Sequence, residues 1–534
     1  MKKTMLFLTC LIVQAFAASP MVIWQKALDY GSNDKIHGMA MDWPGYLCYT
    51  GESKDDSSRL IVAKITTEGD TVWRKTYPEG SNAIGYDLHV FSNHKIAVVG
   101  TEASTGNSRS LSLRYDLNGE LIKALSTPAY AIDGPPVIAA RNEDSCYIGV
   151  WGENLSGNDT KTAFYLLNAL GGVVLTNGYY SGYTPLSGMA ICSSGGVCIG
   201  RPPCSWEKMK NDLTGQGYHD YEETGFVFNA TGVAINDQNQ VYFCGDALKT
   251  VRDFFLFKWD TSGNFLWTAH KGYDLGGDDY CLDMSLDSAS DCYLAGYRIK
   301  GEEEDAALVK TDSDGNLLWK WVDTLPGKQE IEAVEVDPEG YIYLAGSDNA
   351  GTNWNAFVIK IRQPLEISGV VKDSTGKAMK NFTLLVSGDT TLEVTTDNEG
   401  RYNLVIYNGG NYTLRPKQSG WVFNPVQYTY SPLAHRMVNQ DFLNGKWSGI
   451  EEHPIPSQLT LDVDDAGIRF SLPSSSYIRL VAYDVCGRQA AVLAQGTFGV
   501  GNYTVKKPEL EQGVYFVKLD ANNVALCKKL ISLR

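Results

Sequence analysis

The stretch Ile36-His-Gly-Met-Ala-Met-Asp-Trp-Pro-Gly-Tyr-Leu-Cys-Tyr-Thr-Gly51 decides the fold of this chain, because it recurs along most of the sequence. Its last copy reads Ile331-Glu-Ala-Val-Glu-Val-Asp-Pro-Glu-Gly-Tyr-Ile-Tyr-Leu-Ala-Gly346. Each copy holds two alternating apolar runs joined by a turn, which is typical of a β-hairpin with one buried face. The copies close at Gly51, Gly100, Gly152, Gly200, Gly245, Gly296 and Gly346. The sequence therefore predicts seven units of about 50 residues each.

Each unit also carries two further strands, so it has the size of a propeller blade. A third apolar strand such as Ala306-Ala-Leu-Val-Lys-Thr311 follows the hairpin, and a turn then leads into a fourth strand that opens with tryptophan. This turn, Gly-x-x-x-Trp, occurs at Gly69/Trp73, Gly263/Trp267 and Gly315/Trp319. Four strands in about 50 residues are typical of one β-propeller blade. We therefore expect an all-β chain whose main body, residues 19–363, is a seven-bladed β-propeller.

The two ends of the repeat region complement each other. The seventh unit has its third strand at 355–361, but no tryptophan strand follows it. Near the start, Val22-Ile-Trp24-Gln-Lys-Ala27 is such a strand without a unit of its own. Pairing the first strand with the last closes the ring and covers two open sheet edges. The prediction is six continuous blades and one shared blade.

The repeat resembles a known family, the bacterial propeller repeats called SBBP repeats. Gly31-Ser-Asn-Asp34 through Gly51, and Gly277-Asp-Asp279 through Gly296, match its order of glycine, aspartate, apolar alternation, Asp-x-x-Gly turn, tyrosine and glycine. The resemblance covers about residues 21–363. It implies a fold, and that family has no common catalytic residues to transfer.

A different pattern begins near Pro364. Ile367-Ser-Gly-Val-Val-Lys-Asp-Ser-Thr-Gly376 is followed by Thr396–Tyr402, Gly410–Pro416 and Gly420–Pro425. Alternating strands with glycine turns at this spacing are typical of a small antiparallel β-sandwich. The segment resembles the carboxypeptidase regulatory-like domain, which is similar to a transthyretin fold, and we assign residues 364–449 to it. The resemblance implies a spacer or adhesive module and no peptidase activity.

A last segment, residues 450–534, opens with the linker 451–457 and continues as a further domain. Its strands are Tyr477–Arg488, Gly513–Leu519 and the basic end Cys527–Arg534. From residue 458 onward the segment resembles the C-terminal sorting domain of the type IX secretion system, although a cysteine at position 486 departs from that pattern. The resemblance implies the type IX secretion translocon as a partner. The alternative is an unrelated sandwich of the flagellar hook-cap type.

The first 18 residues predict a secretory signal peptide. Lys2 and Lys3 precede an apolar run, Met5–Val13, that is too short to span a bilayer, and Ala15-Phe16-Ala17 is a small-x-small cleavage site. No other segment approaches 18 consecutive apolar residues, so we expect no transmembrane segment. Together with the C-terminal resemblance, this predicts a protein that is secreted or on the outer surface of a Gram-negative bacterium, reached via the periplasm.

Charge and cysteine usage exclude several classes of partner. The net charge is −16, from 46 basic and 62 acidic side chains, which disfavours nucleic acid and anionic lipid. No Cys-x-x-Cys pair occurs, so zinc sites are not expected. One cysteine recurs in the same strand of several units, at Cys48, Cys146, Cys198, Cys244 and Cys292, as a small buried apolar residue would. Cys192, Cys198 and Cys204 leave room for one disulfide bridge.

The search for chemistry yields no catalytic residue, metal site or cofactor. Asp312-Ser-Asp-Gly-Asn316 resembles part of a calcium loop, but the same turn recurs from Asp260 and Asp116, which favours a structural turn. The tryptophan turns are similar to those of quinoprotein propellers, yet the motif is absent from several units. A group of carboxylates in the sixth unit can serve acid–base catalysis, but one member aligns with a repeated turn. These carboxylates belong to Asp278, Asp279, Asp283 and Asp287.

The fourth unit is the irregular one, and it supplies the candidate ligand site. Where its third and fourth strands are expected, the chain runs from Arg201-Pro-Pro-Cys-Ser-Trp206 to Tyr218-His-Asp-Tyr221. Aromatic and charged residues in such a stretch suit a binding loop for carbohydrate or peptide. The alternative is a degenerate blade. The candidate binding residues are Trp206, Tyr218, His219 and Tyr221.

Taken together, the sequence predicts an exported or cell-surface binding, adhesion or scaffold protein that takes a carbohydrate or protein ligand. The alternative is a secreted enzyme that acts on polysaccharide or peptide at the mouth of the propeller channel, because propellers host both functions. Converging carboxylates or a histidine cluster at that mouth would favour the enzyme. An aromatic apolar patch would favour binding.

Overall fold

The computed structural model describes residues 19–532 apart from short gaps at 32, 56, 78–81, 105–106, 127–129, 133, 143–144, 155–159, 169–170, 182–184, 194, 203–204, 270–272, 324–326, 350, 352, 448–457, 465–466, 509 and 522–523. By their internal contacts the residues divide into two compact units, Met1–Gln363 and Pro364–Arg534. The described residues form β-strands and turns without an α-helix, which confirms the expected all-β class. Accordingly, they include no helix of the length and apolarity that a bilayer crossing needs.

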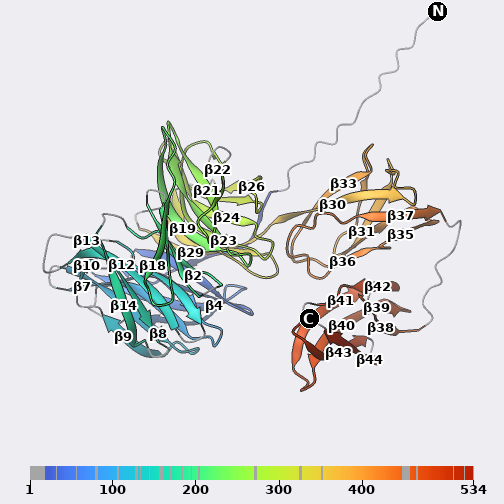
Figure 1. Ribbon diagram of the computed structural model, residues 1–534, viewed down its shortest axis with the longest axis horizontal. Helices are drawn as coiled ribbons and strands as arrows, with labels where there is room; N and C mark the ends of the chain where they lie inside the picture. Colours follow the sequence, from blue (N-terminus) through green and yellow to red (C-terminus); the bar gives the residue numbers. More distant parts are fainter. Residues whose placement is uncertain are drawn as a thin grey trace, which may run out of the picture. The chain divides into compact units, whose positions relative to one another are not determined.

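The first unit consists of antiparallel sheets, mostly of four strands, that follow one another along the chain (Figure 1). The first four sheets contain β2 (Asp34–Asp42), β3 (Tyr46–Lys54), β4 (Ser58–Thr66) and β5 (Thr71–Thr76); β6 (Ala83–Val90), β7 (Ile96–Ser104), β8 (Asn107–Tyr115) and β9 (Leu121–Ser126); β10 (Tyr130–Ile132), β11 (Val137–Asn142), β12 (Ser145–Asn154), β13 (Thr160–Leu167) and β14 (Val173–Ser181); and β15 (Gly188–Ile191), β16 (Val197–Arg201), β17 (Ser205–Met209) and β18 (Gly215–Asp220).

The remaining strands of this unit continue the pattern. They are β19 (Val227–Ile235), β20 (Gln240–Leu248), β21 (Arg252–Asp260) and β22 (Phe265–Ala269); β23 (Asp278–Leu286), β24 (Cys292–Lys300), β25 (Glu303–Thr311) and β26 (Leu317–Val322); and β27 (Lys328–Val336), β28 (Ile342–Asn349) and β29 (Asn355–Arg362). A single parallel pair, Glu304 with Lys328, joins the last two groups into one sheet. Each group is called a blade below and is named by its strands.

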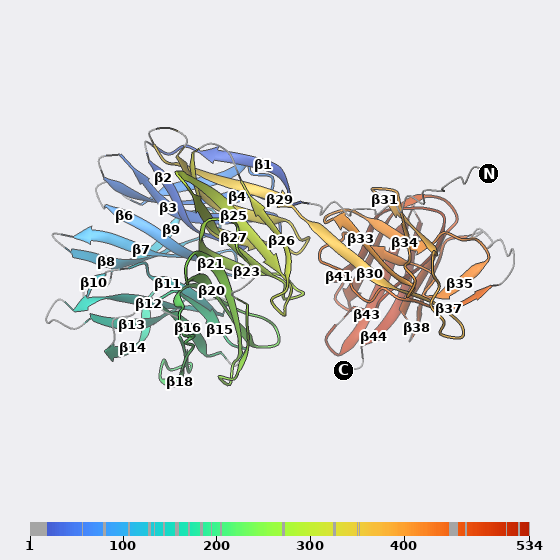
Figure 2. The ribbon, with the colours of Figure 1, turned by 90° about the horizontal axis from the view of Figure 1, so that it is seen from above.

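The first strand of each blade contacts the first strand of the next. These contacts run through β2, β6, β11, β15, β19, β23 and β27 and return from β27 to β2. Figure 2 shows the blades fanned in chain order from blue to yellow. A twisted four-stranded sheet cannot bury both of its faces alone, so each blade packs its apolar faces on its neighbours. The first unit therefore has a β-propeller-like arrangement of blades. The strands β2, β6, β11, β15, β19, β23 and β27 are called inner strands below, and the region between them is called the channel.

The strand β1 (Met21–Leu28) pairs antiparallel with β29, so the start of the chain completes its last blade. Its Trp24 ring lies 6.4 Å from the ring of Tyr343 on β28. The same tryptophan–tyrosine contact occurs within other blades, at 6.3 Å for Trp267 with Tyr242 and 6.3 Å for Trp319 with Tyr293. Trp24 thus occupies the place that the repeat reserves for the tryptophan of a fourth strand.

A close backbone approach explains the glycine that ends each hairpin. Opposite it, the inner strand contains a β-bulge, and the carbonyl oxygen before the bulge points at the glycine. A Cβ on Gly51 would lie 1.9 Å from the oxygen of Lys35, and one on Gly346 would lie 1.9 Å from the oxygen of Glu330. Because real Cβ atoms do not come that close to a backbone atom, no other residue fits without movement of the strands.

In the third blade, the prediction that Gly152 ends the hairpin is wrong. Gly149, not Gly152, pairs with the inner strand there, opposite Val137. Gly152 lies opposite Ile132 of the short strand β10. Both glycines lie near the expected position, and spacing alone cannot choose between them. The strand register decides, because Tyr147 pairs with Ala139 two residues before Gly149.

The second unit begins with a β-sandwich of two four-stranded sheets. One sheet has the order β33-β30-β37-β35 and the other β32-β31-β34-β36. The strands are β30 (Pro364–Asp373), β31 (Thr383–Gly388), β32 (Leu392–Thr395), β33 (Arg401–Tyr407), β34 (Tyr412–Pro416), β35 (Trp421–Asn424), β36 (Tyr428–Tyr430) and β37 (Phe442–Trp447). Alternate residues of both sheets, including Leu384, Leu414 and Phe442, form one buried core.

A second sandwich follows in the same unit. A three-stranded sheet, β38-β39-β42, faces a four-stranded one, β41-β40-β43-β44. The strands are β38 (Thr460–Asp464), β39 (Gly467–Leu472), β40 (Ser476–Asp484), β41 (Gln489–Phe498), β42 (Gly501–Val505), β43 (Gly513–Ala521) and β44 (Val524–Ser532). Phe470, Leu480 and Leu519 belong to its core. β44 pairs along its whole length with β43 and forms one edge of its sheet.

Replacing the closing glycine of the β27–β29 blade tests the close approach. We expect Gly346→Ala to lower the free energy of unfolding by about 3 kcal/mol, because the strands must separate to admit the methyl group. Gly351→Ala is the matched control, since its Cβ would have no neighbour within 4 Å, and we expect a change below about 0.5 kcal/mol. Equal stability of the two variants in urea unfolding would contradict the explanation.

Candidate functional site

The bulges of the inner strands fall in a row, and some of the bulged side chains meet across neighbouring inner strands, as His37 does with Glu332 and Tyr86. In five inner strands the bulge falls at the same place, and one residue is left outside the regular pairing. A bulge re-aims its side chain. The bulged residues are His37, Tyr86, Thr231, Leu282 and Glu332. The same backbone device that requires glycine in the second strand therefore sets the lining of the channel.

His37 is held between two carboxylates. Its Nδ1 lies 2.6 Å from Oε2 of Glu332, and its Nε2 lies 3.9 Å from Oε1 of Glu52. Burial alone would lower the pKa of His37, but the carboxylates of Glu332 and Glu52 outweigh burial and raise the pKa to about 9. The imidazole is therefore protonated at neutral pH. It forms an ion pair there and does not offer a free general base.

A mixed aromatic and charged group includes the residues two positions before three of the bulges, Lys35, Tyr280 and Glu330. Lys35 bonds Glu330 at 3.2 Å and lies 4.0 Å from the ring centre of Trp354. Tyr280 and Tyr297 stack at 4.9 Å, and the guanidinium of Arg252 lies 4.8 Å from the Tyr280 ring centre.

These side chains form one group. Burial raises the pKa of Tyr297 above its ordinary value, and the charges of Glu330 and Glu304 add to the rise. The group is called the mouth cluster below and consists of Lys35, Arg252, Tyr280, Tyr297, Glu330 and Trp354.

Two aspartates that directly follow a bulge connect neighbouring blades. Oδ2 of Asp87 on β6 accepts a hydrogen bond from the backbone N of Ile138 on β11 at 3.0 Å. Oδ2 of Asp283 on β23 accepts one from the backbone N of Val334 on β27 at 2.9 Å. Burial raises the pKa of Asp87 to about 6 and that of Asp283 to about 7, although these hydrogen bonds oppose the rise. Both side chains therefore have a structural role in joining the inner strands.

Glu335 on β27 is a third carboxyl group of the inner strands. Burial raises its pKa to about 8, and the carboxyl groups of Asp283 and Asp87 raise it further. Among the residues that the structure describes, no hydrogen bond ends on its side chain. Three carboxyl groups from three blades thus converge in the channel, and one of them is not used in joining strands.

The other acidic residues noted in the sixth unit have separate roles. Oδ1 of Asp287 accepts the backbone N–H groups of Ala289 and Asp291 in the turn after β23. Oδ1 of Asp337 makes the same two turn contacts with Glu339 and Tyr341. The predicted alignment of these aspartates at a turn is confirmed. The remaining two, at positions 278 and 279, lie at the start of β23.

Three of the candidate binding residues of the fourth unit, Trp206, Tyr218 and His219, lie on strands, and Tyr221 directly follows β18. β17 and β18 pair antiparallel, with Trp206 opposite His219. Trp206 is 1% exposed and stacks on the His219 ring at 4.7 Å. Tyr221 packs on Phe257 and Phe265 of the next blade.

The expectation that this stretch replaces the third and fourth strands is therefore wrong. Trp206, His219 and Tyr221 contribute to packing between blades, whereas Tyr218 is 61% exposed.

Histidine takes over the volume of the missing tryptophan in this blade. Gly217 pairs with Lys208, at the register position where Trp73 pairs with Lys64 and Trp267 pairs with Lys258. A Cβ on Gly217 would lie 3.2 Å from Nε2 of His219, so the imidazole covers that glycine. The ring also packs against Gly263 of the following blade. In this blade a glycine stands at the register position of the tryptophan, and His219, two residues later, fills the space. A search for the Gly-x-x-x-Trp motif therefore does not find this blade.

Cysteines fill apolar space as the sequence suggests. Cys48, Cys146, Cys244 and Cys292 are all buried in the propeller. Cys192 and Cys198 are also buried, and their Sγ atoms are 3.0 Å apart. Both are free thiols in the structure, so they do not form the expected bridge there, and Cys204 lies outside the described residues.

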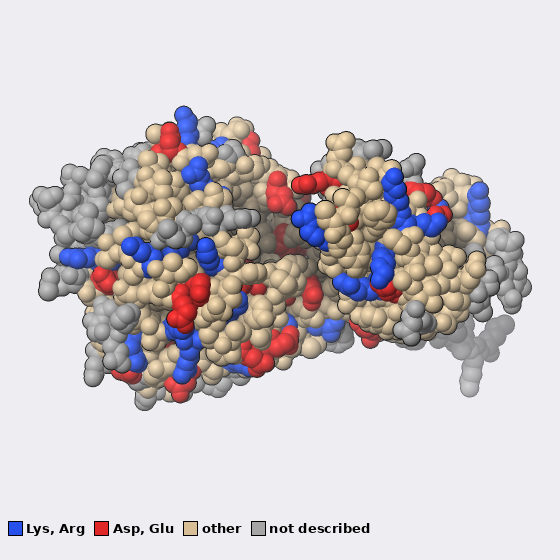
Figure 3. All heavy atoms as spheres, turned by 90° about the horizontal axis from the view of Figure 1, so that it is seen from below, with Lys and Arg blue, Asp and Glu red and all other residues tan. Residues whose placement is uncertain are grey.

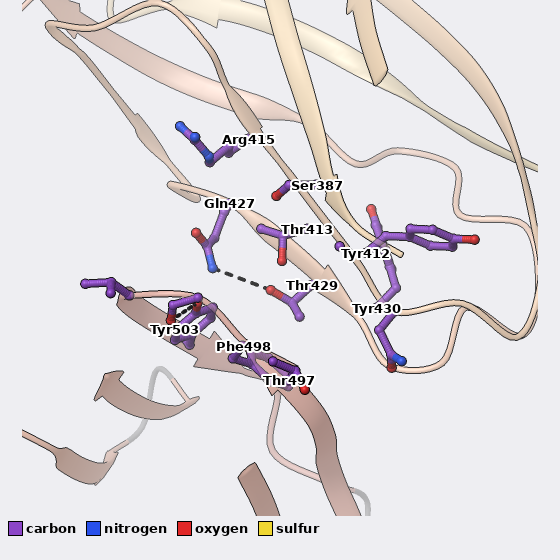
Figure 4. Close-up of a pocket in the computed structure, with 14 residues that line it drawn as sticks. Ser387, Tyr412, Thr413, Arg415, Gln427, Thr429, Tyr430, Thr497, Phe498 and Tyr503 are labelled. Carbon is purple, nitrogen blue, oxygen red and sulfur yellow. Dashed lines mark hydrogen bonds between the residues drawn. The ribbon is translucent and has the colours of Figure 1, made fainter. Parts of the chain in front are cut away.

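The second unit contains a polar pocket of about 260 Å³ (Figure 4). Hydroxyl and amide groups line it, and Nε2 of Gln427 donates a hydrogen bond to Oγ1 of Thr429 at 3.5 Å. Arg415 is the charged residue of its lining. The lining contains no carboxylate or imidazole, so the pocket does not assemble an acid–base pair.

The surface charges are mixed rather than gathered. On the face shown in Figure 3, basic and acidic side chains alternate in small groups between wide neutral areas. Nucleic-acid binding needs a continuous basic stripe. This face does not offer one, in keeping with the net charge of −16.

Comparison with known proteins adds one weak structural likeness. No family model matches the sequence, and no curated protein matches it. Among solved structures, the C-terminal WD40 domain of Sif2 is similar over 63% of this chain and 99% of that chain, with 10% sequence identity and a TM-score of 0.38. The description of the blades above rests on the strand pairing of this chain itself.

A pH series with Glu335→Gln tests the convergence of carboxyl groups. Between the unfolded pKa of about 4.3 and the folded pKa of about 8, the folded chain keeps a proton that the unfolded chain has released. Glu335 therefore makes the wild type lose stability as pH rises through this window, and the variant lacks this contribution. We expect the variant's advantage in urea unfolding to grow from about pH 5 to about pH 8 and then to level off.

The exposed residue Glu302 supplies the control for this series. Glu302→Gln removes the same charge from the surface and should leave the pH profile of the wild type unchanged. Parallel profiles for Glu335→Gln and the wild type would contradict the burial of an unpaired carboxyl group in the channel.

Proposed function

We propose that this chain is an exported, non-enzymatic binding or scaffold protein whose propeller recognises its ligand through the mouth cluster. The observation that carries the proposal is the state of the ionisable groups of the inner strands. His37 is committed to an ion pair, and Asp87 and Asp283 to inter-blade hydrogen bonds. The aromatic rings of Tyr280 and Tyr297 beside Arg252 and Lys35 form a surface for recognition rather than for proton transfer.

The mouth cluster suits a polar ligand with a flat face, either a carbohydrate or a peptide. Tyrosine rings contribute apolar area with a hydroxyl at the rim, and arginine and lysine donate hydrogen bonds to carboxylate or hydroxyl groups. Such clusters of aromatic residues and arginine carry most of the energy at interfaces. The proposal moves the ligand site from the β17–β18 segment, where Trp206 is buried, to the mouth of the channel.

A seven-bladed, closed propeller of the SBBP type is the architecture that we propose for residues 19–363. The return of the inner-strand contacts from β27 to β2 and the pairing of β1 with β29 support closure. For the two sandwiches we propose a carboxypeptidase regulatory-like spacer and a type IX sorting domain. The two-sheet architecture of each domain is compatible with its assignment. The assignments themselves rest on the sequence motifs.

An array experiment tests the binding function. The chain from residue 19 to 534 is applied to a glycan array and to a peptide array, together with Tyr297→Ala and the matched control Tyr218→Ala. We expect the wild type to bind a small set of related ligands, and Tyr297→Ala to lose about tenfold in affinity, which is about 1.4 kcal/mol. Tyr218 is exposed outside the mouth cluster, so its variant should bind like the wild type.

Two outcomes of the array experiment would overturn the proposal. One is the absence of any specific ligand on both arrays. The other is an equal loss in Tyr218→Ala and Tyr297→Ala, which would separate binding from the mouth cluster. Circular dichroism and urea unfolding of each variant show whether a loss reflects the surface or the fold.

A second candidate function, an enzyme acting on polysaccharide or peptide, has one observation in its favour. Glu335 and Asp283 have raised pKa values inside the channel, and raised carboxyl pKa values are typical of general acids. Bound array ligands should therefore also be followed by mass spectrometry. Cleavage by the wild type that is lost in Glu335→Gln would favour the enzyme over the binding protein.

Truncation of the last strand tests export. We propose that residues 450–534 carry the chain across the outer membrane after the signal peptide has delivered it to the periplasm. Removal of residues 520–534 deletes β44 and leaves β43 with an unpaired edge. In a host with type IX machinery, the truncated chain should accumulate in the periplasm, while a fluorescent cargo fused to residues 447–534 should reach the surface or medium. Normal export of the truncated chain would contradict the sorting role.

A further inference from the structure

Three carboxylates of the propeller meet between two blades. Asp253 lies at the start of β21, Asp279 at the start of β23, and Asp274 on the segment that leads into β23. One carboxylate oxygen from each lies within 4.8 Å of the others. The third strand of one blade and the first strand of the next thus contribute to the same group.

The central member of this group is buried with an unused oxygen. Asp279 is 0% exposed. Its Oδ2 accepts the backbone N–H of Leu275 at 2.6 Å, and its buried Oδ1 has no hydrogen-bond partner among the described residues. Oδ1 of Asp253 is likewise buried without a partner there. Two unpartnered, desolvated carboxylate oxygens in one place are costly unless a cation neutralises them.

The nearby basic side chains do not fill this role. Arg298 donates from Nη1 to the carbonyl oxygen of Leu275 at 2.9 Å and from Nη2 to Asp305 at 2.5 Å. Lys320 donates to the carbonyl oxygen of Asp274, not to its carboxylate. The local excess of negative charge therefore remains.

A comparison with the β2–β5 blade shows which features of Asp279 belong to the repeat and which belong to the three-carboxylate group alone. Asp34 is the counterpart of Asp279, since its Oδ2 accepts the backbone N–H groups of Tyr30 and Gly31 at 2.7 and 3.1 Å. Its Oδ1 is unpartnered as well. Among the described residues, however, Asp34 is not part of a group of three carboxylates. The loop contact is thus a property of the repeat, whereas the two additional carboxylates are specific to this one junction.

We propose that Asp253, Asp274 and Asp279 bind one calcium ion, which joins the β19–β22 blade to the β23–β26 blade. Calcium takes oxygen ligands at about 2.4 Å, so two of its ligands can be at most about 4.8 Å apart. The three oxygens satisfy this limit without rearrangement. A site of carboxylates without nitrogen or sulfur selects a hard cation, and water completes the coordination.

Calcium titration of the chain from residue 19 to 534 tests this site. After treatment with EDTA, the protein is titrated with CaCl₂ in a calorimeter, and its Tm is measured with and without about 10 mM Ca²⁺. We expect one saturable site per chain, with a dissociation constant of about 10⁻⁴ to 10⁻³ M, as in other extracellular modules. At ten times that constant, the Tm of a unit of this size should rise by about 2 °C.

Two charge-neutralising variants make the test specific. Asp253→Asn removes one ligand and also part of the repulsion, so it should be at least as stable as the wild type in EDTA and should not respond to calcium. Asp314→Asn, on an exposed turn, removes the same charge elsewhere and should keep the full response. A wild type without saturable binding or Tm shift, or an Asp253→Asn variant that responds normally, would overturn the proposal. A response to Mg²⁺ but not to Ca²⁺ would also overturn it.

Discussion

The close contact between a glycine of the second strand and a carbonyl oxygen of the inner strand is the constraint on which the propeller depends. The bulge that brings this oxygen toward the glycine adds one residue to the inner strand in five blades. Without the bulge, side chains of the inner strands would simply alternate. With it, one residue of each bulged strand is left outside the regular pairing. A requirement of backbone packing thus also determines which residues line the channel.

The channel lining shows how this geometry combines stability and chemistry. Side chains next to the bulge reach the neighbouring inner strand, where Asp87 and Asp283 accept backbone N–H groups and Thr231 donates to the carbonyl oxygen of Cys281. These hydrogen bonds join neighbouring blades through their inner strands. Their cost is a set of desolvated carboxyl groups with raised pKa values. Raised pKa values here therefore report burial between blades, and they are weak evidence for catalysis by themselves.

Much of the fold follows from the sequence, because the repeat is local. The signals of the repeat act within about ten residues: alternation within a hairpin, a turn glycine and a tryptophan. The isolated strand at Trp24 predicts its pairing with the last blade, because that blade lacks a fourth strand. Contacts between repeats were not predictable in the same way. Gly149 and Gly152 differ only in cross-strand register, and Trp206 needs the next blade to become buried. The mouth cluster combines side chains that are far apart in the sequence, so no sequence motif predicts it.

Carboxylates that are close in the sequence show the same limit of sequence-based prediction, because closeness in the chain does not bring their side chains together. Asp278, Asp279, Asp283 and Asp287 are close in the chain, yet strand geometry sends Asp283 into the channel and Asp287 into a turn. Asp279 instead meets Asp253, whose strand belongs to the preceding blade. In a propeller, adjacency of this kind is set by the packing angle between blades, not by spacing. Whether acidic residues of one repeat form a site therefore depends on the position of each residue on its strand. It also depends on which residues of the neighbouring blade lie opposite that position.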